Sequence, residues 1–236
     1  MLGSLGCMHW KWQNCPTGWS SSRSGRSGNP TIILEAIADY DLWIWHAYFG
    51  FPNTSNDVDV NVSASSNLLY NLTQGIAPIA HYVIQGKEYN MGYYLADSIY
   101  PKWSTIVQTI EEPRYPKTEY FAMKQEACKK DLERAIGVLQ ARFTIVVGPV
   151  RDWDKEALRD IMITCIILHN MIVEDERDFT SPIEVAREAP KPEVEMATNQ
   201  DARFQEYLSW YEAIRTKNAH LELQNALVDH LWERSS

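Results

Sequence analysis

A long helical repeat in the second half of the chain constrains the fold more than any other feature. From Glu119 to Phe143, apolar residues recur at steps of three and four, and charged residues occupy the opposite side. This spacing predicts an amphipathic helix. A second helix is predicted over Lys155–Glu176, where apolar residues occur nearly all round, as is typical of a helix buried in a core.

The first hundred residues contain the short apolar, β-branched runs that are typical of strands. Residues 30–38 and 42–49 are predicted to be adjacent antiparallel strands joined by a short turn. Leu2–Trp12 is predicted to be a third strand and Tyr89–Ala96 a fourth. Strands followed by long helices predict an α/β fold.

Composition and charge narrow the class of protein. The chain has 236 residues, of which 45% are hydrophobic and 22% charged, so it is an ordinary globular chain. Its net charge of −9 argues against tight, nonspecific DNA binding. Most of this acidity follows residue 173, because residues 1–173 carry a net charge of only −2. That distribution leaves room for a locally basic face on the main domain.

Targeting and redox features predict a soluble protein of a reducing compartment. The chain opens without the basic and apolar segments of a secretory signal. Its longest apolar run, Ile161–Val173, is interrupted and shorter than the roughly 20 residues that span a bilayer. Four cysteines, none spaced as CxxC, do not form a disulfide framework.

The domain organisation follows from local composition. Residues 178–200 contain three prolines among many acids and are predicted to be a flexible linker. They separate a main domain, residues 1–177, from an amphipathic C-terminal helix within residues 201–236, which either packs back on the domain or binds a partner. Residues 20–28, rich in serine and glycine, are predicted to be a surface loop.

Three acids occupy positions that suit metal chemistry. Asp97 ends an apolar strand, Glu133 borders the apolar stripe of the first helix, and Asp57 follows the tryptophan-rich strand. Carboxylates that converge at strand ends and on a facing helix can hold two Mg²⁺ ions, which clamp the oxygens of a phosphoryl displacement. The alternative is that Asp97 is a turn former and Glu133 a partner in a surface ion pair on its helix.

Several segments, in the right order over about residues 1–178, resemble the plant Harbinger-type transposase-derived nucleases. They are Leu2–Pro16, Pro30–Ala36, Ser55–Asp57, Met91–Pro101, Lys130–Phe143 and Ile166–Ile172. The resemblance implies an RNase H-like DDE nuclease domain: a mixed β-sheet flanked by helices, which cuts DNA in the nucleus with Mg²⁺ or Mn²⁺. Family members typically pair with a separate Myb-like DNA-binding protein.

The resemblance also implies the roles of the acids. Asp97 matches the second catalytic carboxylate and Glu133 the third, whereas Asp57 matches a further acid that can join the metal shell. The first carboxylate does not carry over, because its position is occupied by Gly6. We therefore expect nuclease activity to be absent or very low, and binding of a divalent cation to be weak or lost.

The neighbours of Gly6 cannot easily replace the missing acid. Cys7 and His9 lie at odd offsets on the same strand and point to its other face. Met8 shares the face of Gly6, but its sulfur is too soft to hold Mg²⁺. The alternatives to a nuclease are a domesticated, non-catalytic chromatin or protein-interaction module and a degenerate product without a selected role.

The resemblance also implies an N-terminal helical region before the first strand, and we expect this chain to lack it. The resemblance associates that region with DNA binding. Its absence fits either a truncated gene product or a domesticated derivative that keeps the fold as a binding surface.

Other candidates for chemistry are weaker. A zinc site at Cys7, His9 and Cys15 lacks a second ligand pair of the usual spacing. Nucleophile pairs of a cysteine with a histidine, Cys7 with His46 or Cys165 with His169, compete with inert core roles. Four tryptophans are predicted to pack within the sheet rather than to stack on bases: Trp10, Trp12, Trp43 and Trp45. Four basic residues are explained equally by phosphate contacts or by a solvated helix face: Lys124, Lys129, Lys130 and Arg134.

Overall fold

The computed structural model describes residues 1–16, 31–51, 66–73, 79–152, 154–177, 209, 211–212 and 214–235. Asp57, the predicted loop 20–28 and the predicted linker 178–200 lie outside these residues. Within the described ranges, no helix combines the length and the apolar character needed to cross a bilayer.

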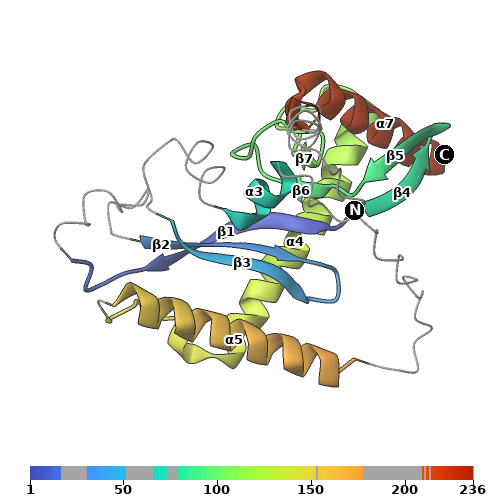
Figure 1. Ribbon diagram of the computed structural model, residues 1–236. Helices are drawn as coiled ribbons and strands as arrows, with labels where there is room; N and C mark the ends of the chain where they lie inside the picture. The colour runs from blue at the N-terminus through green and yellow to red at the C-terminus, as the bar shows by residue number, and fades with distance from the viewer. Residues whose placement is uncertain are drawn as a thin grey trace.

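A mixed five-stranded sheet forms the centre of the fold (Figure 1). Its strands are β3 (Ile44–Phe51), β2 (Thr31–Ala38), β1 (Gly3–Lys11), β6 (Tyr94–Ala96) and β7 (Ile106–Gln108), in that spatial order. β2 is antiparallel to both β3 and β1, whereas β6 and β7 run parallel to β1. This sheet confirms the predicted α/β class and the predicted hairpin.

The predicted strand Tyr89–Ala96 is wrong, because two strands in two sheets replace it. β5 (Lys87–Met91) pairs with β4 (Ile79–Ile84) in a separate hairpin, and β6 joins the central sheet. Gly92 lies between the two strands, and a Cβ atom there would lie 2.5 Å from the side chain of Leu2. A residue without a side chain therefore allows Leu2 to pack where the two strands separate.

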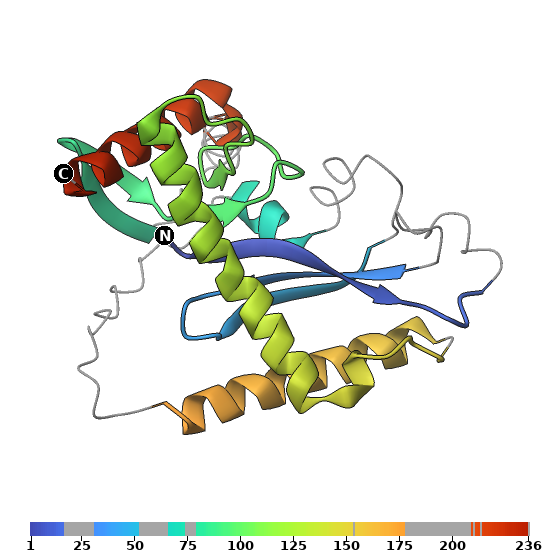
Figure 2. The ribbon, with the colours of Figure 1, turned by 180° about the vertical axis from the view of Figure 1, so that it is seen from behind.

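Two helices cover one face of the sheet. α4 (Pro116–Arg142) runs across β1 and β2, and α5 (Lys155–Asp175) packs against β3 (Figure 2). Both helices confirm the sequence prediction. The first turn of each helix suits its sequence. Pro116 at the start of α4 has no backbone N–H to leave unpaired. Before α5, the Asp154 side chain accepts a hydrogen bond from the Glu156 N–H at 3.0 Å.

The burial of α5 differs from the prediction. Its inner side contributes Leu158, Met162 and Cys165 to the core beneath the sheet. Ile167 and Leu168, which were predicted to be buried, are exposed. Although apolar residues occur nearly all round α5, only the side that faces the sheet is buried.

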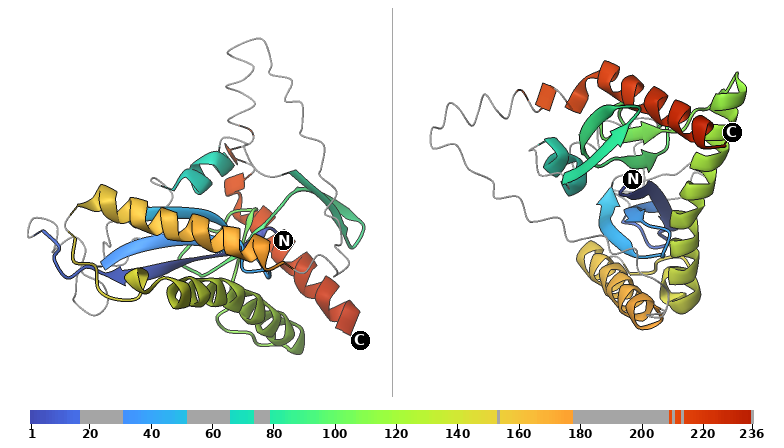
Figure 3. Two further views of the ribbon diagram at one scale, coloured as in Figure 1. Left: turned by 90° about the horizontal axis from the view of Figure 1, so that it is seen from below. Right: turned by 90° about the vertical axis from the view of Figure 1, so that its right-hand side faces the viewer.

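The opposite face and the β7 edge are covered by shorter elements. α3 (Asn67–Thr73) packs Leu69 and Leu72 on the opposite face. α7 (Lys217–Ser235) packs Leu223 and Leu227 against α4, β7 and the β4–β5 hairpin (Figure 3). The C-terminal helix thus packs back on the domain, which is one of the two predicted alternatives.

Candidate functional site

The site predicted from the acids begins where β1 and β6 lie side by side. Leu5 pairs with Ala96, so the register places Gly6 next to Asp97, the first residue after β6. Ser4 and Met8, at even offsets from Gly6, both contact α4. Gly6 therefore faces α4 as well.

Helix α4 crosses directly over Gly6. A Cβ atom built on Gly6 would lie 2.8 Å from Cδ2 of Leu132. One turn earlier in α4, the carbonyl of Cys128 accepts a hydrogen bond from Ser4 Oγ at 2.8 Å. Leu132 thus occupies part of the space into which a longer side chain at position 6 would extend.

The structure brings Gly6, Asp97 and the middle of α4 together. Lys129 pairs with Asp97 from α4. Glu133 follows Leu132 and lies one helical turn after Lys129, on an exposed part of the helix. Asp57, the third predicted metal ligand, lies outside the described residues.

The ion pair between Lys129 and Asp97 sets the electrostatics of this site. The Lys129 ammonium pairs with Asp97 Oδ1 and lies 3.8 Å from Glu126 Oε2. The Asp97 side chain is 43% exposed and that of Lys129 is 21% exposed. The carboxylate that was predicted to bind a metal therefore has a positively charged partner on α4.

The described residues do not fit a two-ion site. Mg²⁺ prefers oxygen ligands, and Gly6 offers none from a side chain. Within the part of the chain that the structure describes, no group of three or more histidine, cysteine, aspartate or glutamate residues is placed to hold a metal ion. Only Asp97 and Glu133 remain as candidate ligands there, and Asp97 is paired with Lys129.

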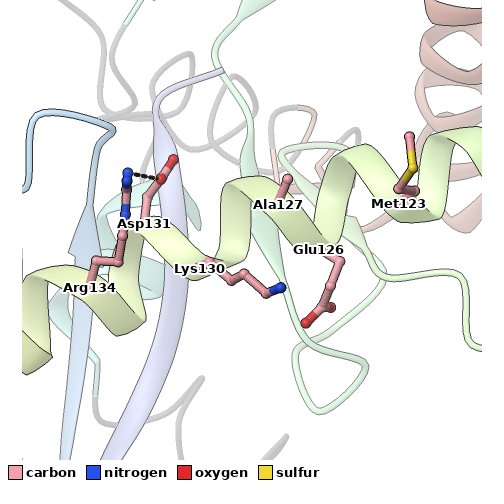
Figure 4. A pocket seen from close by; sticks show the side chains of 6 residues that line it. All are labelled: Met123, Glu126, Ala127, Lys130, Asp131 and Arg134. Carbon is pink, nitrogen blue, oxygen red and sulfur yellow. Dashed lines mark hydrogen bonds and ion pairs between the residues drawn. The ribbon is translucent and has the colours of Figure 1, made fainter.

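The outer side of α4 has a shallow hollow of about 430 Å³ (Figure 4). Its lining residues are Met123, Glu126, Ala127, Lys130, Asp131 and Arg134. Arg134 pairs with Asp131 at 2.5 Å. Two acids and two bases thus alternate on this surface, which matches the solvated helix face better than a basic phosphate-binding face.

A buried polar cluster lies on the opposite face of the sheet, and sequence reasoning missed it. Glu35 of β2 has no exposed surface. It accepts hydrogen bonds from Ser66 Oγ at 2.5 Å and from the Tyr100 hydroxyl at 3.3 Å. His46 Nε2 lies 3.3 Å from Glu35 Oε1, within ion-pair distance but without hydrogen-bond geometry. The available signal was a single acid inside an otherwise apolar strand.

Cys7 extends this cluster and behaves as a core thiol. Its sulfur lies 3.2 Å from the Tyr100 hydroxyl. Burial raises the pKa of Cys7 to about 12, and burial also raises the pKa of Tyr100 well above its usual value. Cys7 therefore points away from the face of Gly6, as predicted, and stays protonated at neutral pH.

The remaining cysteine and histidine candidates have structural partners. His169 Nε2 lies 2.9 Å from the Leu42 carbonyl, and Nδ1 lies 3.2 Å from Arg142 Nη1. Burial lowers the pKa of His169, so the ring is neutral at pH 7. Burial raises the pKa of Cys165, which disfavours a thiolate. His169 thus ties α5 to the β2–β3 turn and α4.

The tryptophan prediction holds for two residues and fails for another. Trp10 and Trp12 are buried, and their indole N–H groups donate to the carbonyls of Gly148 and Asp152. Trp45 is mostly exposed, although its ring lies 5.9 Å from that of Trp43. A bulge in the β2–β3 pairing between Ile44 and His46 explains the difference, because it interrupts the alternation of side chains.

Comparison with known proteins decides the family. The family described as plant transposon protein matches residues 1–180, most of the chain. The chain belongs to this family. It is also similar to "Protein ALP1-like" of Arabidopsis thaliana, with 25% identity over 162 residues, 63% of this chain and 36% of that protein. The chain thus matches about a third of the length of this relative, and no solved structure matches it.

Proposed function

We propose that the chain is a transposase-derived DNA endonuclease domain whose phosphodiester hydrolysis or strand transfer is impaired. The observation that carries the proposal is the position of Gly6. It lies beside Asp97 and beneath α4, on the face of the sheet where the resemblance requires the first acid. Membership of the plant transposon protein family supports the nuclease ancestry.

The proposed roles follow the resemblance, residue by residue. Asp97 and Glu133 are the surviving catalytic carboxylates, and Asp57 is a further metal ligand. The reaction of the family uses Mg²⁺ or Mn²⁺, and the described residues of this chain lack the ligand set for it. DNA as substrate, a Myb-like partner and a nuclear location are parts of the same proposal.

A nuclease assay with Mg²⁺ or Mn²⁺ tests this proposal. The unchanged chain, Asp97→Ala, Gly6→Asp and the double variant Gly6→Asp with Asp97→Ala are compared on supercoiled DNA. We expect no cleavage, or very weak cleavage, by the unchanged chain. Gly6→Asp should gain activity, and the added Asp97→Ala should remove it. Strong cleavage by the unchanged chain that survives Asp97→Ala would refute the assignment of the acids.

The second candidate is a non-catalytic chromatin or protein-interaction module. The Lys129–Asp97 pair favours it, because the protein itself neutralises this carboxylate. α7 is a poor docking element for such a module, since Leu223 and Leu227 already pack inside the domain. If neither the unchanged chain nor Gly6→Asp cleaves DNA while both remain folded, this second candidate is favoured.

A further inference from the structure

The outer side of α5 carries one row of side chains that is complementary to itself. The residues Arg159, Ile163, Ile167, Met171 and Asp175 are spaced four apart, and we call them the α5 row. Residues at this spacing form a continuous ridge on a helix surface. The ridge is apolar in the middle, basic at its N-terminal end and acidic at its C-terminal end.

Four residues of the α5 row are exposed to solvent, and Ile163 is half-buried. Ile167 is 54% exposed and Met171 is 60% exposed, while Arg159 and Asp175 are exposed as well. Figures 1 and 2 show no other described element on the outer side of α5. The inner side of the same helix is fully used by the core, so the row is a second apolar surface on one helix.

The order of charges along the α5 row makes it complementary to the same row of a second copy of the chain. A two-fold axis at Ile167 reverses the row, because Arg159 and Asp175 are both eight residues away from it. Each Arg159 then faces the Asp175 of the other copy, and Ile163 faces Met171. A symmetric interface requires such a self-complementary patch.

Helix packing allows this contact. Ridges spaced four residues apart pack together at a crossing angle of about −50°. At that angle the two ridges stay parallel along their length, so the charged ends remain paired. Asp160 and Glu174, which flank the row, swing to opposite sides of the crossing, and like charges therefore do not meet.

We propose that α5 is a homodimer interface, formed by two antiparallel α5 rows that cross at Ile167. A single helix pair buries less area than the roughly 1,600 Å² of a standard interface. The dimer is therefore weak and concentration-dependent. The row has no excess of positive charge that would favour DNA instead.

Charge reversal in the full-length chain tests the proposal by sedimentation velocity over a wide range of concentration. Arg159→Glu alone and Asp175→Arg alone each place like charges at both ends of the dimer. Each should weaken dimerisation at least about tenfold. An equimolar mixture of the two variants restores both opposite-charge pairs and should dimerise like the unchanged chain, as should the double variant.

Ile167→Glu tests the apolar centre and should abolish the dimer. The matched control is Met123→Glu, an exposed apolar residue on α4, which should leave dimerisation unchanged. Circular dichroism verifies that each variant is folded. A chain that is monomeric at every concentration overturns the proposal. A dimer that is indifferent to Ile167→Glu, or a mixture of charge variants that associates no better than either alone, also overturns it.

Discussion

On the face of the sheet that packs against α4, Asp97 and Glu133 lie near solvent, whereas on the other face Glu35 is completely buried. Glu35 receives hydrogen bonds from Ser66 and Tyr100, and His46 lies close to it. Among the described residues, the Asp97 carboxylate pairs with Lys129, and its neighbour Gly6 contributes no side chain. Both faces belong to the same five-stranded sheet.

The difference separates the needs of folding from those of chemistry. A buried carboxylate is costly unless hydrogen bonds satisfy it, so every partner of Glu35 supports the fold. Asp97 beside α4 and Glu133 on α4 are accessible to water and contribute little to stability. An acid can therefore be absent from this side of the sheet while the fold remains intact.

The largest expected effect concerns Glu35. Glu35→Ala leaves the hydroxyl groups of Ser66 and Tyr100 without their acceptor in the core. It should lower the free energy of unfolding by about 3 kcal/mol, whereas Glu35→Gln keeps an acceptor oxygen and should cost about 1–2 kcal/mol. Urea denaturation measures both. The matched control, Glu133→Ala on the exposed side of α4, should stay within about 0.5 kcal/mol. If Glu35→Ala and Glu133→Ala lowered the free energy of unfolding equally, the buried and the exposed acids would not differ in their contribution to the fold.

A smaller effect is expected where Leu132 lies over Gly6. Gly6→Ala brings a Cβ atom to 2.8 Å from Leu132 Cδ2 and should cost about 1–3 kcal/mol. Combining Gly6→Ala with Leu132→Val should recover part of that loss, because the shorter side chain makes room. Denaturation of the two single variants and the double variant measures the coupling. Strictly additive losses would show that the two residues do not compete for space.

His169 makes the α5 side of the domain sensitive to acid. Burial lowers its pKa in the folded protein, so the unfolded chain binds a proton first as the pH falls below about 6.5. Stability is greatest above that pH and falls as the pH drops toward the lower pKa of the folded state. His169→Gln should be less stable by about 1 kcal/mol at pH 7 and should lose less on going to pH 5. If the difference in free energy of unfolding between the unchanged chain and His169→Gln increases from pH 7 to pH 5, this account is wrong.

The smallest effect belongs to the Asp97–Lys129 pair. A double-mutant cycle with Asp97→Asn and Lys129→Met should give a coupling below about 1 kcal/mol, because both side chains are partly exposed. Added salt should reduce it further. Denaturation at low and high salt is the measurement. A coupling of several kcal/mol would mean that Asp97 contributes as much to the stability of the fold as the buried Glu35 does.

Local patterns explain which parts of the fold were predictable. The helix patterns of residues 119–143 and 155–176 and the two apolar runs of the hairpin lie within short windows, and they predict α4, α5, β2 and β3. The separation of β5 from β6 depends on parallel pairing with β1, about ninety residues away in sequence. Such long-range pairing leaves little trace in a local window.

The candidate site was predictable only in part. The resemblance points to Gly6, Asp97 and Glu133, and the structure places Gly6 beside Asp97 under α4. Their roles stay predictions. The sequence does not predict the pairing of Lys129 with Asp97, because Lys129 is one of several charged residues on its helix and the pattern does not identify its partner. Glu35 lies among apolar residues in the sequence of β2, and this pattern is itself a local sign of a buried acid.

The most direct test of the account is a Mn²⁺ titration of the folded protein, followed by electron paramagnetic resonance of the free ion. The comparison is between the unchanged chain and Gly6→Asp, each with and without Asp97→Asn. We expect Gly6→Asp to bind Mn²⁺ at least about tenfold more tightly than the unchanged chain, and Asp97→Asn to abolish that gain. Equal binding by the two proteins would contradict the claim that Gly6 stands in the place of a lost metal-binding acid.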